Sequence, residues 1–268
     1  MPGSSRSFAF LTRPKWIAGH VLALVAIVAF VNLGLWQLRR LDERKQLNRL
    51  LEARLTAAPV PWDDLVAQYG DDPDALEYRM VLLDGSYVLD EEVILRSRSY
   101  EGISGHDVLT PLLLDDGTAV VVDRGWVPID ATDPPVAGAE PPTGRVEGIG
   151  IIRTTQVRGS FGPVDPPDGV LTRVARVDLA RLQQQSSLHL APVYAELQSQ
   201  EPPQATDSPI PVPPPEQTER NHLSYAIQWF LFAVVVAVGY PILIFRTSLS
   251  GSAPAPGPDP EKTPASPV

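Results

Sequence analysis

The sequence offers few groups that could bind a metal. Its 268 residues contain four histidines and no cysteine, which excludes disulfide frameworks, cysteine-ligated zinc and covalently attached c-type haem. Only two methionines could supply soft thioether ligands, which argues against a copper carrier. The histidines are too scattered for a helical zinc pair, and they are His20, His106, His189 and His222.

Nucleophilic chemistry has one weak candidate, a cluster of Ser104, His106 and Asp107. Residues this close in sequence rarely face one another as a catalytic triad. The chain also contains no nucleophile elbow, P-loop, dinucleotide fingerprint or HExxH motif. We therefore expect a protein that is not an enzyme, with a membrane-bound hydrolase as the weaker alternative. The net charge of −10 argues against a nucleic-acid partner.

His222 is the most suggestive single residue, because it begins a helical stripe that continues through Tyr225, Trp229 and Tyr240. One interpretation is an interfacial histidine with an aromatic belt, packed against another helix. The other is a neutral imidazole that ligates a haem iron, with the porphyrin lying along Tyr225 and Trp229. The residues alone leave both interpretations open.

Two uncharged, apolar segments position these groups. Residues 16–38 and 223–245, at about 1.5 Å per residue, can each cross a hydrocarbon core of roughly 30 Å. A cleaved signal peptide is the alternative for the first segment. Its apolar run is too long for that, and it continues into a charged helical pattern instead of a small-residue cleavage site. We expect two transmembrane helices.

Two spans place both termini on one side of the membrane and residues 39–222, with 17 basic and 30 acidic residues, on the other. Basic residues flank both ends of the first span, so the positive-inside rule does not fix the orientation. We favour cytoplasmic termini, because long domains translocate largely regardless of charge. His20 and His222 would then lie about 24 Å apart in depth and could not ligate one haem.

The segment between the spans combines a helical stalk with a β-rich domain. Leucines at helical spacing follow the first span until Pro59. Strand patterns dominate after Tyr78, with a hairpin turn at 115–117 and a short helix at 178–185 capped by Asp178. The predicted fold is two transmembrane helices flanking one α+β, mostly antiparallel β extracytoplasmic domain that curls toward a barrel. The predicted segments are a cytoplasmic N-terminus (1–15), a transmembrane helix (16–38), a helical stalk (39–58), the β-rich domain (59–199), a stiff proline-rich connector (200–221), a second transmembrane helix (222–245) and a disordered cytoplasmic tail (246–268).

Several sequence blocks, in order along the chain, resemble the Surfeit locus protein 1 family. The most specific are VDRGWVP at 122–128 and NHLSYAIQWF at 221–230. A second tryptophan that the family pattern has after Trp36 is absent here, and the region around Phe161 is short. The remaining blocks are LGLWQLRRLDERKQL (33–47), LEYR (76–79), HDVLTPLLLDDGTAV (106–120), GRVEGIGIIR (144–153) and PVYAEL (192–197).

The resemblance implies an assembly factor for haem–copper cytochrome c oxidase, which binds or hands over haem A for insertion into the catalytic subunit. It implies a bacterial plasma membrane location, with the oxidase catalytic subunit, haem A synthase and membrane lipid as partners. The family's proposed haem-ligating histidine matches His222, and its tryptophan at the end of the first span matches Trp36. The expected contacts of haem A are then His222, Tyr225, Trp229 and Trp36. A membrane scaffold that binds no haem is the alternative.

Two arginines of the resembling blocks, Arg79 and Arg124, have two interpretations. The structural one pairs Arg124 with a carboxylate on a strand and places Trp126 in the core. In the functional one, Arg79 or Arg124 pairs with a haem propionate or an oxidase loop, because a guanidinium matches a carboxylate in two hydrogen bonds.

Overall fold

The structure is a computed structural model that describes residues 9–70, 72–160, 162–217 and 221–250. The chain divides into two compact units. One comprises residues 1–47 and 218–268, and the other comprises residues 48–217. Parts of four predicted segments lie outside the described residues, namely 1–8 of the N-terminus, 71 and 161 of the β-rich domain, 218–220 of the connector and 251–268 of the tail.

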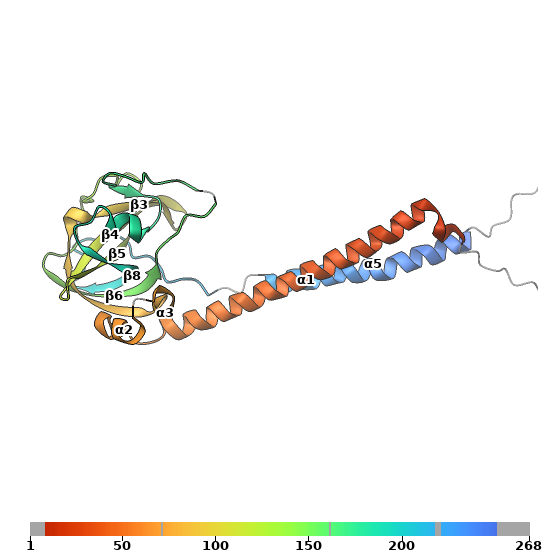
Figure 1. The fold of residues 1–268 in the computed structure, drawn as a ribbon, viewed down its shortest axis with the longest axis horizontal. Helices are drawn as coiled ribbons and strands as arrows, with labels where there is room; N and C mark the ends of the chain where they lie inside the picture. Colours follow the sequence, from red (N-terminus) through yellow and green to blue (C-terminus); the bar gives the residue numbers. More distant parts are fainter. Residues whose placement is uncertain (1–8, 71, 161, 218–220, 251–268) are drawn as a thin grey trace, which may run out of the picture. The chain divides into compact units, whose positions relative to one another are not determined.

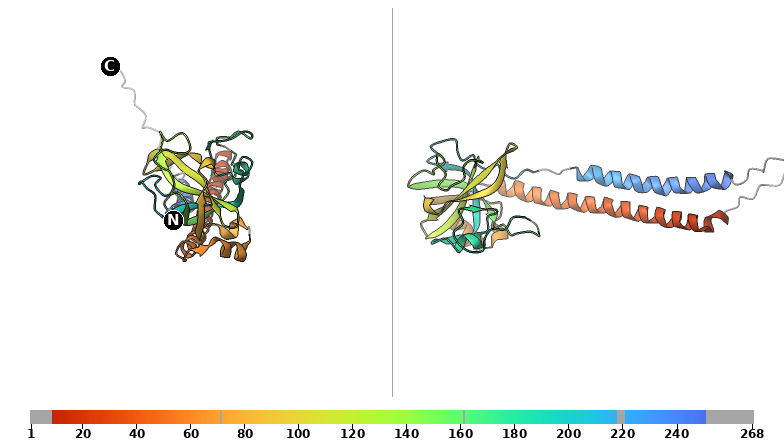
Figure 2. Two further views of the ribbon diagram at one scale, coloured as in Figure 1. Left: turned by 90° about the vertical axis from the view of Figure 1, so that its left-hand side faces the viewer. Right: turned by 90° about the horizontal axis from the view of Figure 1, so that it is seen from above.

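The first unit is an antiparallel pair formed by the apolar part of α1 (Pro14–Leu55) and by α5 (His222–Ser250), with the short helix η1 (Ala9–Thr12) before α1 (Figures 1 and 2). His20 contacts Tyr240 at one end of the pair, and Gln37 contacts His222 at the other. Both helices are long and apolar enough to cross a membrane.

Small residues bring the two helices together. A Cβ added at Gly34 would lie 2.7 Å from the Phe230 ring, and Ala226 and Ala233 on α5 are buried. Phe30 stacks on Trp229 with ring centroids 5.7 Å apart. Close approach at small residues is how apolar helices pack in a bilayer. Side chains therefore fill the space between α1 and α5.

The helix ends follow local chemistry. α1 ends at Leu55, which confirms the stop predicted before Pro59. α5 continues to Ser250, five residues past the predicted end of the second span at residue 245. Near its end the Thr247 hydroxyl donates to Leu243 O at 2.9 Å and the Ser248 hydroxyl donates to Phe245 O at 2.7 Å. Such hydroxyl bonds to the preceding turn are compatible with continued helix.

The second unit is a mostly β domain built around a closed barrel (Figure 1). The described sheet has the order β1-β2-β6-β8-β5-β4-β3-β7, and an additional pairing of β2 with β4 closes a ring of five strands. Most pairs are antiparallel, as predicted, but β1–β2, β3–β7 and β5–β8 pair in parallel. The strands are β1 (Val60–Pro61), β2 (Met80–Tyr87), β3 (Val93–Tyr100), β4 (Ile103–Leu114), β5 (Thr118–Pro128), β6 (Arg145–Thr154), β7 (Arg173–Val174) and β8 (His189–Glu201).

Short helices complete the domain. The predicted helix after Asp178 is present as α4 (Leu179–Gln183), and the Asp178 side chain accepts from the N–H of Arg181. The predicted hairpin is confirmed too, since β4 ends at Leu114 and β5 begins at Thr118. α2 (Trp62–Tyr69), α3 (Pro73–Leu76) and η2 (Leu89–Glu91) were not predicted.

The barrel interior is the main hydrophobic core. It is filled by aliphatic side chains of the five ring strands, and Trp62 and Leu65 of α2 cover one end. A second core lies outside the barrel wall, where Leu179 and Leu182 of α4 pack against β3, β4 and β5. These two layers bury side chains on both faces of several strands, which explains their nearly continuous apolar sequence.

The predicted connector 200–221 is partly a component of the domain. Ile210 forms a two-way backbone bridge with Trp126, with N···O distances of 2.8 and 2.7 Å. The bridge requires Gly125, which has φ of +124° and whose Cβ would lie 2.1 Å from Ile210 O. The interpretation of this segment as only a spacer is therefore corrected. β8 pairs with β5 only as far as Asp123, so the backbone of β5 beyond that residue can pair with Ile210.

Candidate functional site

The candidate haem ligand, His222, has a defined hydrogen-bonding partner in the helical unit. Its Nδ1 lies 2.9 Å from Oε1 of Gln37. With the amide oxygen of Gln37 toward the ring, this bond forms in the tautomer that has the proton on Nδ1, and this tautomer keeps a lone pair on Nε2. Histidines that bind metals show this arrangement, in which the second ring nitrogen donates to an oxygen that fixes the tautomer. In that tautomer, Nε2 of the half-buried His222 ring has the lone pair that a metal ligand requires.

The aromatic residues predicted around His222 are divided between the helix interface and the outer surface. Trp229 stacks on Phe30 inside the interface, whereas Tyr225 is 51% exposed and Trp36 is 46% exposed. Trp36 precedes Gln37 and so lies at the level of His222. Because side chains fill the interface, a planar ligand of His222 would lie on the outer surface of the helix pair. The sequence-based stripe is confirmed as a packing face, with Tyr225 at its rim.

His20 has a different environment. Its Nδ1 lies 2.8 Å from the Tyr240 hydroxyl, at the opposite end of the helix pair from His222. The rings of His20 and Trp16 are 6.5 Å apart. The two histidines therefore cannot share one ligand. Among the described residues, no group of three or more His, Asp or Glu side chains is arranged to hold a metal ion.

Arg124 is completely buried in the domain. Its guanidinium donates to Glu92 Oε2 at 3.1 Å and to Ala139 O. Burial lowers the pKa of Arg124 and raises that of Glu92, while the attraction between the two charges opposes both shifts. The structural interpretation of Arg124 is confirmed in that it pairs with a carboxylate, but Glu92 lies just before β3 and not on a strand as predicted. A ligand outside the folded domain has no access to it.

Arg79 lies at the junction of α3 and β2. Its Nε donates to Ala75 O at 2.8 Å, and its guanidinium lies 3.9 Å from the centre of the Tyr69 ring. These contacts join α2 to α3. Arg54, near the end of α1, donates to the carbonyls of Asp74 and Glu77 and ties α1 to the same corner of the domain. Arg79 therefore packs α2 against α3. It lies just before β2, whereas Arg124 lies on β5.

A buried acidic cluster escaped the sequence analysis. Asp107, Asp123 and Glu196 line a hollow of about 290 Å³ together with Arg98 and Arg153. Burial raises the pKa of Asp107 to about 6, and burial and the neighbouring carboxylates raise the pKa of Asp123. Arg153 contacts Glu196 at 2.7 Å. The sequence feature that could have revealed this cluster is a charged residue inside an otherwise apolar strand, as Asp107 is in HDVLTP and Asp123 is in VVVDRG.

The hydrolase alternative finds no support in the geometry. Adjacent residues of a strand point to opposite faces, and His106 and Asp107 are adjacent on β4. Nε2 of His106 faces Arg173 at 3.2 Å. Asp107 pairs instead with Arg98 at 3.3 Å. The imidazole and the carboxylate therefore serve different partners.

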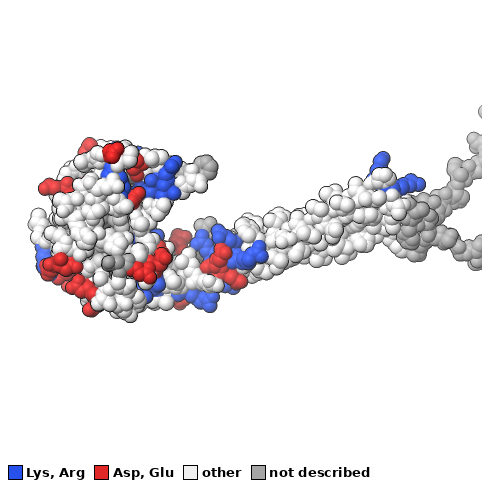
Figure 3. All heavy atoms as spheres, viewed as in Figure 1, with Lys and Arg blue, Asp and Glu red and all other residues white. Residues whose placement is uncertain are grey.

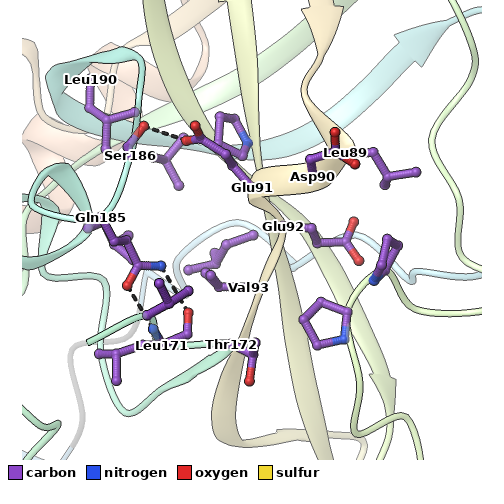
Figure 4. A pocket seen from close by; sticks show the side chains of 17 residues that line it. Leu89, Asp90, Glu91, Glu92, Val93, Leu171, Thr172, Gln185, Ser186 and Leu190 are labelled. Carbon is purple, nitrogen blue, oxygen red and sulfur yellow. Dashed lines mark hydrogen bonds between the residues drawn. The ribbon is translucent and has the colours of Figure 1, made fainter.

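A cavity at the edge of the barrel lies between η2 and residues 170–172 (Figure 4). The Gln185 amide bonds both the N–H and the C=O of Leu171, each at 2.9 Å, and the Glu91 carboxylate accepts from Ser186. Its volume is about 140 Å³. This is below the roughly 300–1,000 Å³ of typical ligand cavities, so the cavity is too small for a tetrapyrrole.

Comparisons with known proteins give one family. Residues 24–234 match the model of the SURF1 family. The chain is 29% identical over 239 residues to an uncharacterised SURF1-like protein of Mycobacterium bovis, covering 86% of this chain and 84% of the relative. It is 30% identical over 230 residues to a SURF1-like protein of Drosophila melanogaster, covering 79% and 72%. It is 35% identical over 115 residues to the cytochrome oxidase assembly protein Shy1 of Saccharomyces cerevisiae, covering 42% and 28%.

Proposed function

Because the chain belongs to the SURF1 family, we propose that it assists the assembly of cytochrome c oxidase from a bacterial plasma membrane. The name of the yeast relative supports the role in oxidase assembly, and the mycobacterial relative supports a bacterial setting. The two apolar helices would anchor the chain, with both termini in the cytoplasm and the β domain outside. The catalytic subunit of the oxidase is the proposed partner, with haem A synthase as a further candidate.

The cargo in this proposal is haem A, held at the outer end of the helix pair. The single observation that carries it is the bond from Nδ1 of His222 to Gln37. With the proton on Nδ1, Nε2 of His222 would be the atom that holds the iron. Trp36 and Tyr225 would contact the porphyrin, because both expose about half of their surface beside this level of the helices. Trp229 would support the site from the interface by its stacking on Phe30.

The open character of this site suits transfer. The helices pack closely where Gly34 meets Phe230 and where Phe30 stacks on Trp229, so the cargo would lie on their outer surface and keep one face toward lipid or toward a partner. A half-covered ligand can be taken over by a second protein without separation of the helices. Arg79 and Arg124 would maintain the domain rather than bind a propionate, since both are engaged within it.

The test is to co-express the protein with haem A synthesis, purify it in detergent and record its visible spectrum. We expect bound haem in the wild type and in His20→Ala, and loss of haem in His222→Ala. His20→Ala is the matched control, because it also removes a histidine hydrogen-bonded across the helix pair. Equal haem content in the two variants would overturn the role of His222.

A protein-only scaffold is the second candidate function. It is favoured by the filled helix interface and by the small size of the cavity shown in Figure 4. The scaffold requires that a haem-free His222→Ala chain still captures the catalytic subunit and supports normal oxidase maturation. Capture without maturation would favour the haem-handling function instead.

A further inference from the structure

Positive charge in the β domain is concentrated on one segment. The domain, residues 48–217, has 12 arginines, no lysine and 27 acidic residues. The arginine-rich segment, defined as residues 155–181, together with Arg96 contains five arginines and three aspartates, so the rest of the domain has seven arginines against 24 acids. In Figure 3 blue spheres gather at the upper right of this domain and red spheres dominate its lower left.

The arginine-rich segment is held by hydrogen bonds within itself and by an ion pair with Arg96 of β3. Arg96 pairs with Asp165 at 2.9 Å. Arg181 donates to Pro166 O at 2.9 Å and to Gly169 O at 2.6 Å, and Arg176 donates to Pro163 O. The described residues of this loop, 155–160 and 162–181, are therefore fixed at several points.

The charges of this segment are not neutralised inside the domain. Among the described residues, none of its four arginines forms an ion pair with a carboxylate. Arg176 and Arg181 donate to neutral carbonyls, and Arg173 faces the imidazole of His106. Elsewhere in the domain Arg124, Arg145 and Arg153 all pair with carboxylates. The segment thus has unpaired positive charge on a domain that is otherwise strongly negative.

Large apolar side chains are exposed on the same segment. Val157 is 84% exposed, Val164 is 62% exposed and Val170 is 80% exposed. Exposed valines and arginines that share one held loop match the two chemical layers of an anionic bilayer surface, which has negative headgroups above apolar chains. A purely acidic protein surface would complement the arginines and leave the valines without apolar contacts.

We propose that the arginine-rich segment docks the β domain onto anionic phospholipid headgroups, with Val157 and Val164 entering the interface. The inference rests on the proposed membrane anchoring, because α1 and α5 keep the domain beside a bilayer. The arginines would contact the phosphates, and the valines would be shielded from water. The segment would then restrict how the tethered domain moves above the membrane.

The experiment uses the full chain in lipid nanodiscs, and the absence of native cysteine makes single-site labelling possible. An environment-sensitive fluorophore is attached to Val164→Cys or, as the control, to Asp63→Cys. Asp63 is also exposed, but it lies together with Asp84, Asp115 and Asp116 on an acidic part of the domain. We expect a blue shift at position 164 in phosphatidylglycerol-containing discs, a weaker one in pure phosphatidylcholine discs, and none at position 63. About 1 M salt should reduce the shift, because it shortens the Debye length to about 3 Å.

Substitutions at Arg158 separate charge from packing, since this side chain has no ion pair with a described residue. Arg158→Glu should reduce the lipid-dependent shift, and Arg158→Lys should retain it. A fluorophore at position 164 that stays in a water-like environment in both lipids would overturn the proposal. A shift that requires the oxidase catalytic subunit would overturn it in favour of a protein partner. If the chain does not co-migrate with the discs, the anchoring itself fails, and the docking proposal fails with it.

Discussion

The hydrogen bond with Gln37 is the feature that makes His222 a candidate ligand and not only an interfacial histidine. Replacing Gln37 with leucine removes the acceptor for Nδ1 and leaves the imidazole tautomer and ring orientation unfixed. Loss of such a supporting partner typically weakens metal binding by about 10–100-fold. We therefore expect Gln37→Leu to weaken haem binding by about tenfold or more in a titration followed by absorbance. Gln228→Leu, the same change at an exposed position of α5, should leave binding unchanged.

Asp107 should give the domain a pH dependence of known sign. Burial raises its pKa from an ordinary value of 3.8 to about 6, so between these values the folded state keeps a proton that the unfolded state releases. Its contribution to stability is complete below about pH 4 and is lost as the pH rises through 6, with an upper limit of about 3 kcal/mol. Thermal unfolding of wild type and Asp107→Asn between pH 4 and 7 checks this. The difference between them should shift in favour of Asp107→Asn as the pH rises, and parallel curves would contradict the assignment.

Elements determined by neighbouring residues were predicted, and those determined by distant pairings were not. The hairpin at 115–117, the Asp178 cap and the end of α1 depend on a few adjacent residues. The ring closure by β2 and β4 and the parallel pairing of β5 with β8 join residues far apart in sequence, which no local pattern reveals. α2 had a readable signal in the helical spacing of Trp62, Leu65 and Tyr69.

In the candidate site, too, features set by neighbouring residues were predicted and contacts between distant residues were not. His222 stood out because it is an ionisable residue at the edge of an apolar span. Its bond with Gln37 depends on how two helices nearly 200 residues apart in sequence align, so it needed the structure. The buried partner of Arg124 was expected to be a carboxylate, but its identity as Glu92 depended on the fold.

The pairing of Ile210 with β5 can be tested at Gly125. An added side chain would collide with Ile210 O and would force a left-handed backbone on a non-glycine residue. Gly125→Ala should therefore release the segment around Ile210, which limited proteolysis would detect as faster cleavage between residues 202 and 217. Gly159→Ala is the control, because nothing lies within 4 Å of its added Cβ. Equal cleavage rates in both variants would show that the bridge does not restrain this segment.

The proposed topology makes a prediction for the whole molecule. Two membrane crossings place both termini on one side and the domain on the other. In intact spheroplasts a membrane-impermeant maleimide should label Asp133→Cys on the exposed surface of the domain, whereas Ser5→Cys should react only after lysis. The native sequence without cysteine provides the blank. Labelling of both positions before lysis would rule out a two-span arrangement with cytoplasmic termini.

The position of β8 in the barrel has a consequence for biosynthesis. This strand is made last, yet it is inserted between β5 and β6. A nascent chain therefore cannot seal the barrel until Glu201 has left the ribosome, and until then both neighbouring strands present open edges that invite mispairing. Only 20 residues separate Glu201 from the start of α5. Completion of the barrel and membrane entry of α5 thus become nearly simultaneous steps of translation.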